Sequence, residues 1–513
     1  MVEASENNKR IAKNTVMLYF RMLILMCVSL YTSRIVLQTL GETDYGLYSV
    51  VGGIVVLLSF LNNAMSSATQ RFLNFEMGKK NAEGLRFVFS SAVFIHAIVA
   101  VVVLLLAETL GLWFLGTCMN IPPDRVVAAH WVYQFSVAAF MVNILSVPYN
   151  AAIIAHEKMS AFAYISILDA CLRLLLVYLV QVLLFDKLIV YGFLMFLVGG
   201  LLRFVYGVYC RRHFDEARFS RNYIDKALAR KMMSFSSWTV FGTLGHILHT
   251  QGIAICVNLF FSPAVNAALG ISNVVNTKVN GFVSNFQVAL NPQIVKNYAV
   301  GNLEEMHKLI FRGCRFSFFL ISFFAIPLIV EAPAILDFWL GKAPEYTVIF
   351  VRIVLLIAIV NCYSGILANS QGATGKIKTY QLTLTTVGAF HVPFALVAFY
   401  LGAPPYASSW IYLAIVFLLQ LIRVCFVSRS VGMPAMKFCR SVVWPCVLVL
   451  VLASVAPVIL HFCWHGGFLV LVAKCAASFA CTSLIAFTLG MEAGERKMVI
   501  GIFKKKILRQ NDR

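Results

Sequence analysis

Charge is scarce in this 513-residue chain, and acidic charge is the scarcest. Only 12% of the residues are Asp, Glu, Lys or Arg, whereas 60% are hydrophobic and the mean hydropathy is +0.83. Soluble domains carry about 25% charged residues, so this composition excludes a water-soluble fold. The 22 acidic residues are outnumbered by 42 Lys and Arg. Because these cations lie between apolar runs, with no basic stripe interleaved with aromatics, we expect no nucleic-acid partner.

Motifs that carry enzyme chemistry are missing as well. None of the 13 Cys residues forms a C-x-x-C pair or has the Cys/His spacing of a zinc site. No Gly-rich phosphate loop and no nucleophile elbow occurs. The first apolar run is too long for the core of a cleaved signal peptide, so we expect it to remain as a helix. The sequence predicts a protein that is not an enzyme, with no catalytic residue, metal or cofactor.

Long apolar runs recur along the chain and predict its fold class, an all-α polytopic membrane helix bundle. One span needs about 20 apolar residues, and cutting at charged or Gly/Pro-rich breaks gives about fourteen spans. We expect them at residues 14–40, 45–75, 87–110, 126–154, 159–185, 188–210, 233–260, 264–295, 309–336, 347–371, 379–401, 406–427, 438–461 and 468–489.

Lys and Arg in the short loops predict the orientation of these spans, since cytoplasmic loops are enriched in both. One side collects residues 9–13, 79–86, 158, 211–231, 296–308, 376–378, 437–440 and the tail 496–513. The other side holds only Arg125, Lys187 and Lys342. We therefore expect both termini to be cytoplasmic.

Two pairs of similar segments indicate an internal repeat. The stretch Gly78–Arg86 is similar to Val300–Lys308, and Ala155–Met159 is similar to Ala373–Ile377. This pattern predicts two pseudo-symmetric six-helix lobes, residues 1–215 and 216–430, followed by an extra helix pair and a basic tail, residues 431–513. Parallel repeats of this kind place a substrate cavity between the halves, near the middle of the bilayer.

Charged residues inside a span are costly, so each should be paired, reach the headgroups or line water. Arg21 and Lys278 lie far from the ends of their spans and have no carboxylate nearby in sequence, which makes them candidate substrate-binding residues. Asp169 is the carboxylate that we place at mid-membrane, and it is the candidate for ion coupling. It stands four residues from Arg173, so the two side chains either neutralise each other or serve the substrate. Further candidates for substrate binding are Arg34 and His249.

Histidines and amides within the spans leave two interpretations open. The isolated His96 and His391 are more often hydrogen-bonded structural residues than ligands. Amide-rich runs occupy the second and eighth spans, and their candidate residues are Asn62, Asn63, Gln70, Asn276 and Asn280. These amides either hydrogen-bond neighbouring helices or line a hydrated cavity. A cavity with amides beside cations suits sugar hydroxyls and phosphate oxygens.

Three segments carry a resemblance to a known family: Lys9–Thr15, Ser33–Tyr48 and Gln70–Phe72. Together they resemble the polysaccharide and O-antigen flippases of the multidrug/oligosaccharidyl-lipid/polysaccharide exporter (MOP) superfamily, and the likeness covers nearly the whole chain. The resemblance implies two lobes in a V that carry an undecaprenyl-pyrophosphate-linked glycan to the outer leaflet of the cytoplasmic (inner) membrane. It also implies alternating access driven by a proton or sodium gradient or the membrane potential, a cationic lumen, and contact with other polysaccharide-assembly proteins.

Two other functions compete with this one. A drug or cation antiporter of the same superfamily needs a membrane-embedded carboxylate, and the first span offers none. A membrane polymerase or glycosyltransferase acting on lipid-linked sugars typically needs a large extracytoplasmic loop, whereas every loop predicted on that side is short. Both alternatives are therefore ranked below the flippase.

Overall fold

The computed structural model describes residues 14–496, except 30, 33–34, 37, 41–43, 45–46, 49–58, 118–120, 122, 184, 262, 341–342, 465 and 493. All regular secondary structure in these residues is helical, which confirms the predicted all-α fold class. The chain divides into two compact units, and two long helices, α8 (Lys226–Phe260) and α9 (Pro263–Ala299), contribute to both.

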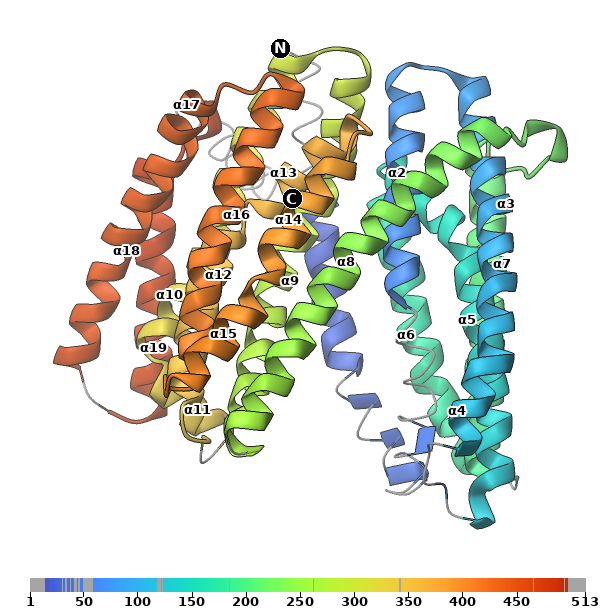
Figure 1. Cartoon of the computed structure of the whole chain (residues 1–513), viewed down its shortest axis with the longest axis horizontal. Coiled ribbons are helices and arrows are strands. Elements are labelled where there is room, and N and C mark those ends of the chain that lie inside the picture. Colours follow the sequence, from blue (N-terminus) through green and yellow to red (C-terminus); the bar gives the residue numbers. More distant parts are fainter. Residues whose placement is uncertain are drawn as a thin grey trace, which may run out of the picture. The chain divides into compact units, whose positions relative to one another are not determined.

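Unit 1 consists of residues up to Thr243 together with residues 295–301. Most of its helices run alongside one another, whereas α8 crosses obliquely (Figure 1). They are residues 14–29, α2 (Ser59–Gly78), α3 (Ala82–Leu106), α4 (Leu112–Thr117), α5 (Val126–Ala155), α6 (Met159–Val182) and α7 (Lys187–His213), followed by the first part of α8. A core of buried side chains from α2, α3, α5 and α7 includes Leu73, Phe89 and Tyr149.

Unit 2 consists of residues 244–294 and 302–513. Besides parts of α8 and α9, it contains α10 (Leu303–Val330), α11 (Ala332–Leu340), α12 (Thr347–Asn361), α13 (Ser364–Ala373), α14 (Lys378–Ala389), α15 (His391–Tyr400), α16 (Ala407–Val431), α17 (Ala435–Phe438), α18 (Trp444–Cys463) and α19 (Phe468–Ile485). The division between the units falls inside α8. The boundaries at residues 215 and 430, which derive from the internal repeat, stay predictions.

Eleven helical segments in the described residues are long and apolar enough to cross a membrane, judged by length and composition. They are residues 82–117, 123–155, 159–182, 187–213, 226–257, 303–330, 347–373, 378–400, 407–431, 435–463 and 468–490. The other three predicted spans correspond to residues 14–29, α2 and α9. The first has a short described helix, and the amides that mark α2 and α9 lower their mean hydropathy. About fourteen spans therefore fit the observed helices.

Some predicted spans are interrupted helices. The span predicted at residues 379–401 is divided into α14, which ends at Ala389, and α15, which begins at His391. Pro393 has no N–H to donate to the carbonyl four residues earlier, which belongs to Ala389, so the helix breaks at this point. His391 is thereby placed at a bend.

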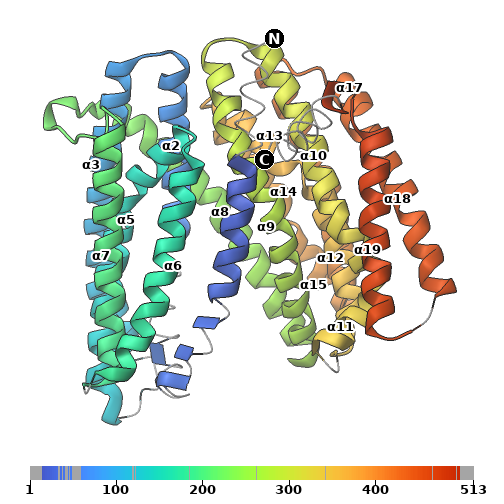
Figure 2. The same ribbon diagram turned by 180° about the vertical axis from the view of Figure 1, so that it is seen from behind.

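The last two spans pack as a pair against α10, as Figure 2 shows. Arg315 on α10 is buried, and its two terminal nitrogens each lie 2.6 Å from a carboxylate oxygen, one of Glu492 and one of Glu495. Both acids follow α19. The pairing compensates the buried cation and holds the end of the helix pair on α10.

Candidate functional site

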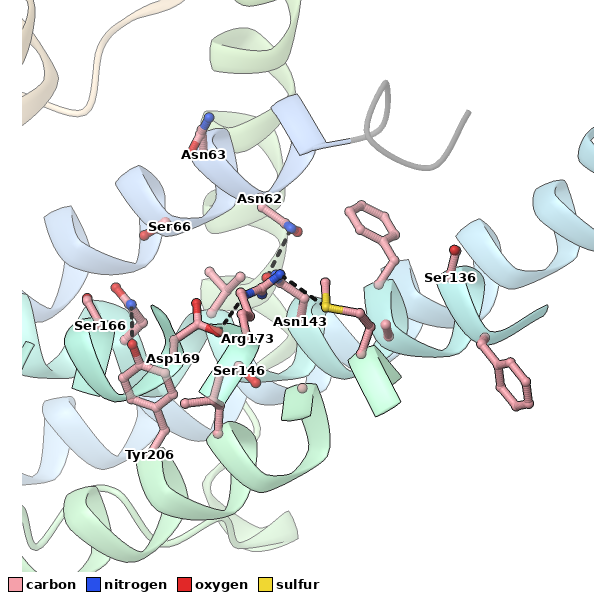
Figure 3. A pocket seen from close by; sticks show the side chains of 18 of the residues that line it. Asn62, Asn63, Ser66, Ser136, Asn143, Ser146, Ser166, Asp169, Arg173 and Tyr206 are labelled. Atoms are coloured by element: carbon pink, nitrogen blue, oxygen red, sulfur yellow. Dashed lines mark hydrogen bonds and ion pairs between the residues drawn. The ribbon is translucent and has the colours of Figure 1, made fainter. Parts of the chain in front are cut away.

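Unit 1 contains a partly polar cavity of about 520 Å³ lined by residues of α2, α5, α6 and α7 (Figure 3). Half of the residues that line it carry an amide or a hydroxyl. The polar lining consists of Asn62, Asn63 and Ser66 of α2, Ser136, Asn143, Ser146 and Asn150 of α5, Ser166, Asp169 and Arg173 of α6, Tyr206 of α7, and Tyr48. An amide-rich lining of this kind would be penalised against lipid, but it can hydrogen-bond a polar ligand.

Helical spacing explains why α5 presents so many polar groups to the cavity. Ser136, Asn143 and Asn150 follow at intervals of seven residues, which places them on one face of the helix. The amide of Asn62 donates to Oδ1 of Asn143 over 3.3 Å, and Figure 3 shows Asn62 directed toward Asn143. The amide of Asn150 donates to the Tyr206 hydroxyl over 3.4 Å. These contacts orient the lining and leave other polar atoms for a ligand.

Gly199 leaves open space on the α7 side of the cavity. A Cβ built at this residue would meet no atom within 4 Å. The neighbouring Gly200 is equally unhindered but does not line the cavity. Since neither glycine requires a positive φ, a larger side chain can be introduced at either position without backbone strain.

Asp169 and Arg173 form an ion pair in the wall of the cavity. Nε of Arg173 donates to Oδ1 of Asp169 over 2.6 Å, and both side chains remain partly exposed. The expectation that these residues meet on one helix face is confirmed. They also line a second cavity of about 380 Å³, together with Ser29, Thr32 and Tyr191. A ligand in either cavity can therefore contact both charges.

Arg21 lies on the helix of residues 14–29, beside the cavity. Its guanidinium stacks over the Phe162 ring at 4.2 Å, and Phe162 precedes the cavity residue Ser166 by one turn of α6. Within the described part of the chain, no carboxylate pairs with Arg21, and its buried Nε has no hydrogen-bond partner. The cation is thus placed next to the lining without being neutralised.

The remaining predicted site residues lie elsewhere. Gln70 donates to Ser66 over 2.9 Å and so contacts the lining indirectly. On α9, in the part that belongs to unit 2, the Asn280 amide donates to Asn276 over 2.6 Å, and Lys278 is exposed. Arg34 lies outside the described residues. His249 is buried in unit 2 against His391 and does not line the cavity.

The sequence analysis missed the contribution of α5. Asn143, Asn150 and Ser136 line the cavity, although the span that contains them has a mean hydropathy of 1.7 and reads as an ordinary apolar helix. The available signal was their seven-residue spacing, which marks a polar stripe on an otherwise apolar helix.

Solved structures with similar folds are transporters. A MATE transporter in the bent conformation superposes with a TM-score of 0.70 and 11% identity, covering 85% of this chain and 97% of the other. The Vibrio cholerae MATE transporter VcmN in its bent form gives 0.66 and 15%, covering 84% and 98%. A MOP superfamily transporter from Pyrococcus furiosus, for which reverse polarity of the binding pocket suggests a different function, gives 0.66 and 12%, covering 82% and 96%. At these identities the likeness shows the fold.

The amino-acid sequence shows which family the chain belongs to. No curated protein matches it. The profile of a family described as polysaccharide biosynthesis protein, however, matches residues 11–299, which is more than half of the chain. This match includes every helix that lines the cavity of unit 1. Since the family profile spans more than half of the chain, including the cavity helices, the chain belongs to the polysaccharide biosynthesis protein family.

Proposed function

We propose that this membrane protein is a flippase for lipid-linked glycans. It moves an undecaprenyl-pyrophosphate-linked oligosaccharide or polysaccharide repeat unit from the cytoplasmic to the outer leaflet of the inner membrane by alternating access. Both termini are cytoplasmic in this proposal, and the glycan passes to other polysaccharide-assembly proteins. The observation that supports it best is the cavity of unit 1, whose lining is rich in amides and hydroxyls.

The lining suits a glycan because each sugar hydroxyl both donates and accepts a hydrogen bond. The amides of Asn62, Asn143 and Asn150 offer donors and acceptors on one wall, and Ser66, Ser146 and Ser166 add hydroxyls. Pockets for small ligands measure about 300–1,000 Å³, so a cavity of about 520 Å³ can hold a few sugar rings.

The cations suit the pyrophosphate that joins glycan to lipid. Arg173 faces the cavity, and Arg21 stands beside it with no carboxylate partner in the described residues. Arg binds phosphate oxygens through paired N–H donors, and such charge-assisted bonds are stronger than neutral ones. An anionic group would also lower the cost of holding Arg21 within the membrane.

A cation antiporter is the second candidate, and Asp169 is the observation that favours it. This carboxylate lines the cavity, where it could bind a cationic drug. Arg173 lies 2.6 Å from it, however, so an incoming cation would have to displace an arginine on the same helix. The flippase ranks first because Asp169 is hydrogen-bonded by Nε of Arg173, which leaves the two terminal nitrogens of the guanidinium to donate to a phosphate.

Reconstitution tests the two candidates side by side. The purified protein is placed in vesicles that contain a fluorescent undecaprenyl-pyrophosphate oligosaccharide, and an outer reagent measures how much glycan reaches the other leaflet. A parallel assay follows ethidium efflux. We expect the wild type to translocate the glycan. Gly199→Leu should block translocation, because the leucine occupies space in the cavity, whereas Gly200→Leu should leave it unchanged. Ethidium efflux without glycan translocation would contradict the flippase proposal and favour the antiporter.

A further inference from the structure

The second cavity of unit 1 differs in chemistry from the first. It has a volume of about 380 Å³ and is lined by residues of the first span, α6 and α7. Leu25, Val28, Val36 and Ala170 give it four aliphatic side chains. We call this space the apolar cavity, and the space of about 520 Å³ the amide cavity.

The two aliphatic hydroxyls in the apolar cavity are engaged within their own helix. Oγ of Ser29 donates to the Met26 carbonyl over 3.0 Å, and Oγ1 of Thr32 donates to the Val28 carbonyl over 2.7 Å. Because each hydroxyl carries one hydrogen, neither can donate to a ligand at the same time. This part of the lining therefore suits hydrocarbon better than sugar.

The two cavities share Tyr48, Asp169 and Arg173 as lining residues. Ala170, which follows Asp169, lines the apolar cavity but not the amide cavity. The Tyr48 ring also meets the ring of Tyr191 edge to face at 4.8 Å, and Tyr191 belongs to the apolar cavity. Polar and apolar linings thus meet at the Asp169–Arg173 ion pair, near the middle of α6.

The guanidinium of Arg173 can bind a phosphate at this boundary. Its Nε is used by Asp169, and Nη1 lies 3.8 Å from Sδ of Met195, a residue of the amide cavity. A thioether is a weak acceptor, so the terminal nitrogens keep hydrogens for phosphate oxygens. A phosphate bound there would have the amide cavity on one side and the apolar cavity on the other.

A lipid-linked glycan has its parts in the same order, with sugar, pyrophosphate and hydrocarbon in sequence. If the pyrophosphate binds Arg173, the prenyl carbons joined to it must also lie inside unit 1. Prenyl groups in the amide cavity would cover amides and hydroxyls without hydrogen-bonding them, which is unfavourable. The apolar cavity avoids this cost. Its volume of about 380 Å³ falls within the range of ligand pockets, about 300–1,000 Å³, and suits a short stretch of the chain.

We propose that the apolar cavity binds the first isoprene units of the lipid carrier, while Arg173 holds the pyrophosphate at the boundary with the amide cavity. The identity of this ligand rests on the proposed function. The division into two subsites goes beyond it, because it assigns the sugar and the lipid of one substrate to separate cavities that share an ion pair.

Photo-crosslinking tests the lipid subsite in the wild-type protein, without a glycan and without transport. Undecaprenyl pyrophosphate with a diazirine in its first isoprene unit is added to the full chain in nanodiscs, irradiated, and the adducts are located by mass spectrometry. We expect adducts on Leu25, Val28 or Ala170 that unlabelled undecaprenyl pyrophosphate suppresses and excess phospholipid does not. Adducts confined to exposed residues such as Leu175 of α6, or adducts that phospholipid suppresses equally, would overturn the proposal.

Two truncated ligands then separate the subsites by equilibrium binding. Undecaprenyl pyrophosphate lacks the sugars, and a glycosyl pyrophosphate methyl ester lacks the lipid. Ala170→Phe should weaken binding of the first about tenfold, because overpacking the apolar cavity costs about 1–3 kcal/mol, and should leave the second unchanged. Gly199→Leu, in the amide cavity, should have the reverse effect.

The matched control is Leu175→Phe, which adds bulk at an exposed position of the same helix and should affect neither ligand. Unchanged binding of undecaprenyl pyrophosphate by Ala170→Phe would contradict the lipid subsite. If Ala170→Phe fails to fold, the adducts on the wild type still decide the question.

Failure of this subsite and failure of the flippase give different results. Adducts in the apolar cavity, without glycan translocation in vesicles, would support the lipid subsite and remove the flippase. Glycan translocation with adducts only outside the apolar cavity would retain the flippase and overturn the subsite.

Discussion

Glu157 and Lys296 form an ion pair across 139 residues of sequence, with 2.7 Å between Oε1 and Nζ. The Glu157 carboxylate is almost fully buried in the turn between α5 and α6, and Lys296 lies near the end of α9. The same end of α9 packs against Gly78, where a Cβ would lie only 2.7 Å from Ala299. These contacts explain why residues 295–301 belong to unit 1 although the rest of α9 up to residue 294 belongs to unit 2.

The first prediction is that Lys296→Met destabilises the protein more than the double variant Glu157→Gln, Lys296→Met. Removing only the lysine leaves a buried carboxylate without this cation, whereas the double variant removes the charge as well. We expect a coupling free energy of about 0.5–3 kcal/mol between the two positions. Thermal unfolding of the wild type, the two single variants and the double variant in detergent measures this coupling free energy. The control is Lys308→Met, which removes an exposed ion pair with Glu304 and should leave the melting temperature unchanged. Additive effects of the two substitutions would contradict the interpretation.

The second prediction concerns Arg21, which lies beside the cavity of unit 1, and Lys278 on α9 in unit 2. Neither forms an ion pair within the described residues. Arg21→Gln and Lys278→Gln should each lower glycan translocation about ten- to hundredfold, since a charge-assisted bond to phosphate contributes about 1.5–3 kcal/mol. Arg21→Lys and Lys278→Arg should retain partial activity because they preserve the charge. Membrane abundance should stay near that of the wild type, and Lys79→Gln, which removes an exposed cation, serves as the control. Full translocation by the double glutamine variant would end this assignment.

The third prediction is an acid-dependent contribution of Glu216, which lies in the loop between α7 and α8. Burial acts to raise the pKa of this carboxyl, but the His156 hydrogen bond over 2.5 Å, a backbone hydrogen bond and the charges of His156 and Arg86 outweigh it. The pKa is therefore lowered from its ordinary 4.5. A group with a lowered folded-state pKa stabilises the protein above its unfolded pKa, and the contribution is lost as pH falls through the folded pKa.

Glu216→Gln should thus reduce the free energy of unfolding by about 1.5–3 kcal/mol near neutral pH, and the difference from wild type should shrink once the pH falls below about 4.5. Melting curves over an acidic pH series measure this. Asp215→Asn, at the exposed neighbouring position, is the control. A difference that stays constant into strong acid would show that the carboxylate charge is not responsible.

The fourth prediction tests whether the cavity contains water. In a background without native Cys, Asn63→Cys should react with a water-soluble thiol reagent, because Asn63 is exposed and lines the cavity. Ala64→Cys, at the next residue of α2, should stay unreactive since Ala64 is only 1% exposed. The same reagent applied to Asn276→Cys and Asn280→Cys extends the test to α9. Equal labelling of positions 63 and 64 would contradict the orientation of α2 about its axis, in which Asn63 but not Ala64 faces the cavity.

Local patterns were sufficient for a large part of this protein. Apolar runs predicted the helices, because in lipid the backbone N–H and C=O groups of a span must hydrogen-bond within that span, whatever its neighbours are. The Asp169–Arg173 pair could likewise be predicted, since residues four apart meet on one helix face wherever that helix is packed. The amides of Asn62 and Asn63 likewise predicted from the sequence that α2 carries a polar run.

Only the tertiary structure decided which residues meet across helices. Asn62 contacts Asn143, His249 contacts His391, and Glu157 contacts Lys296, in each case over 81 residues or more of sequence. These partnerships depend on the rotation of each helix about its axis and on how closely two backbones approach. Gly245 and Gly252 bring α8 against the break at His391. Hydropathy carries no information about either quantity, because it records how much of a helix is apolar and not which neighbour its polar face will meet.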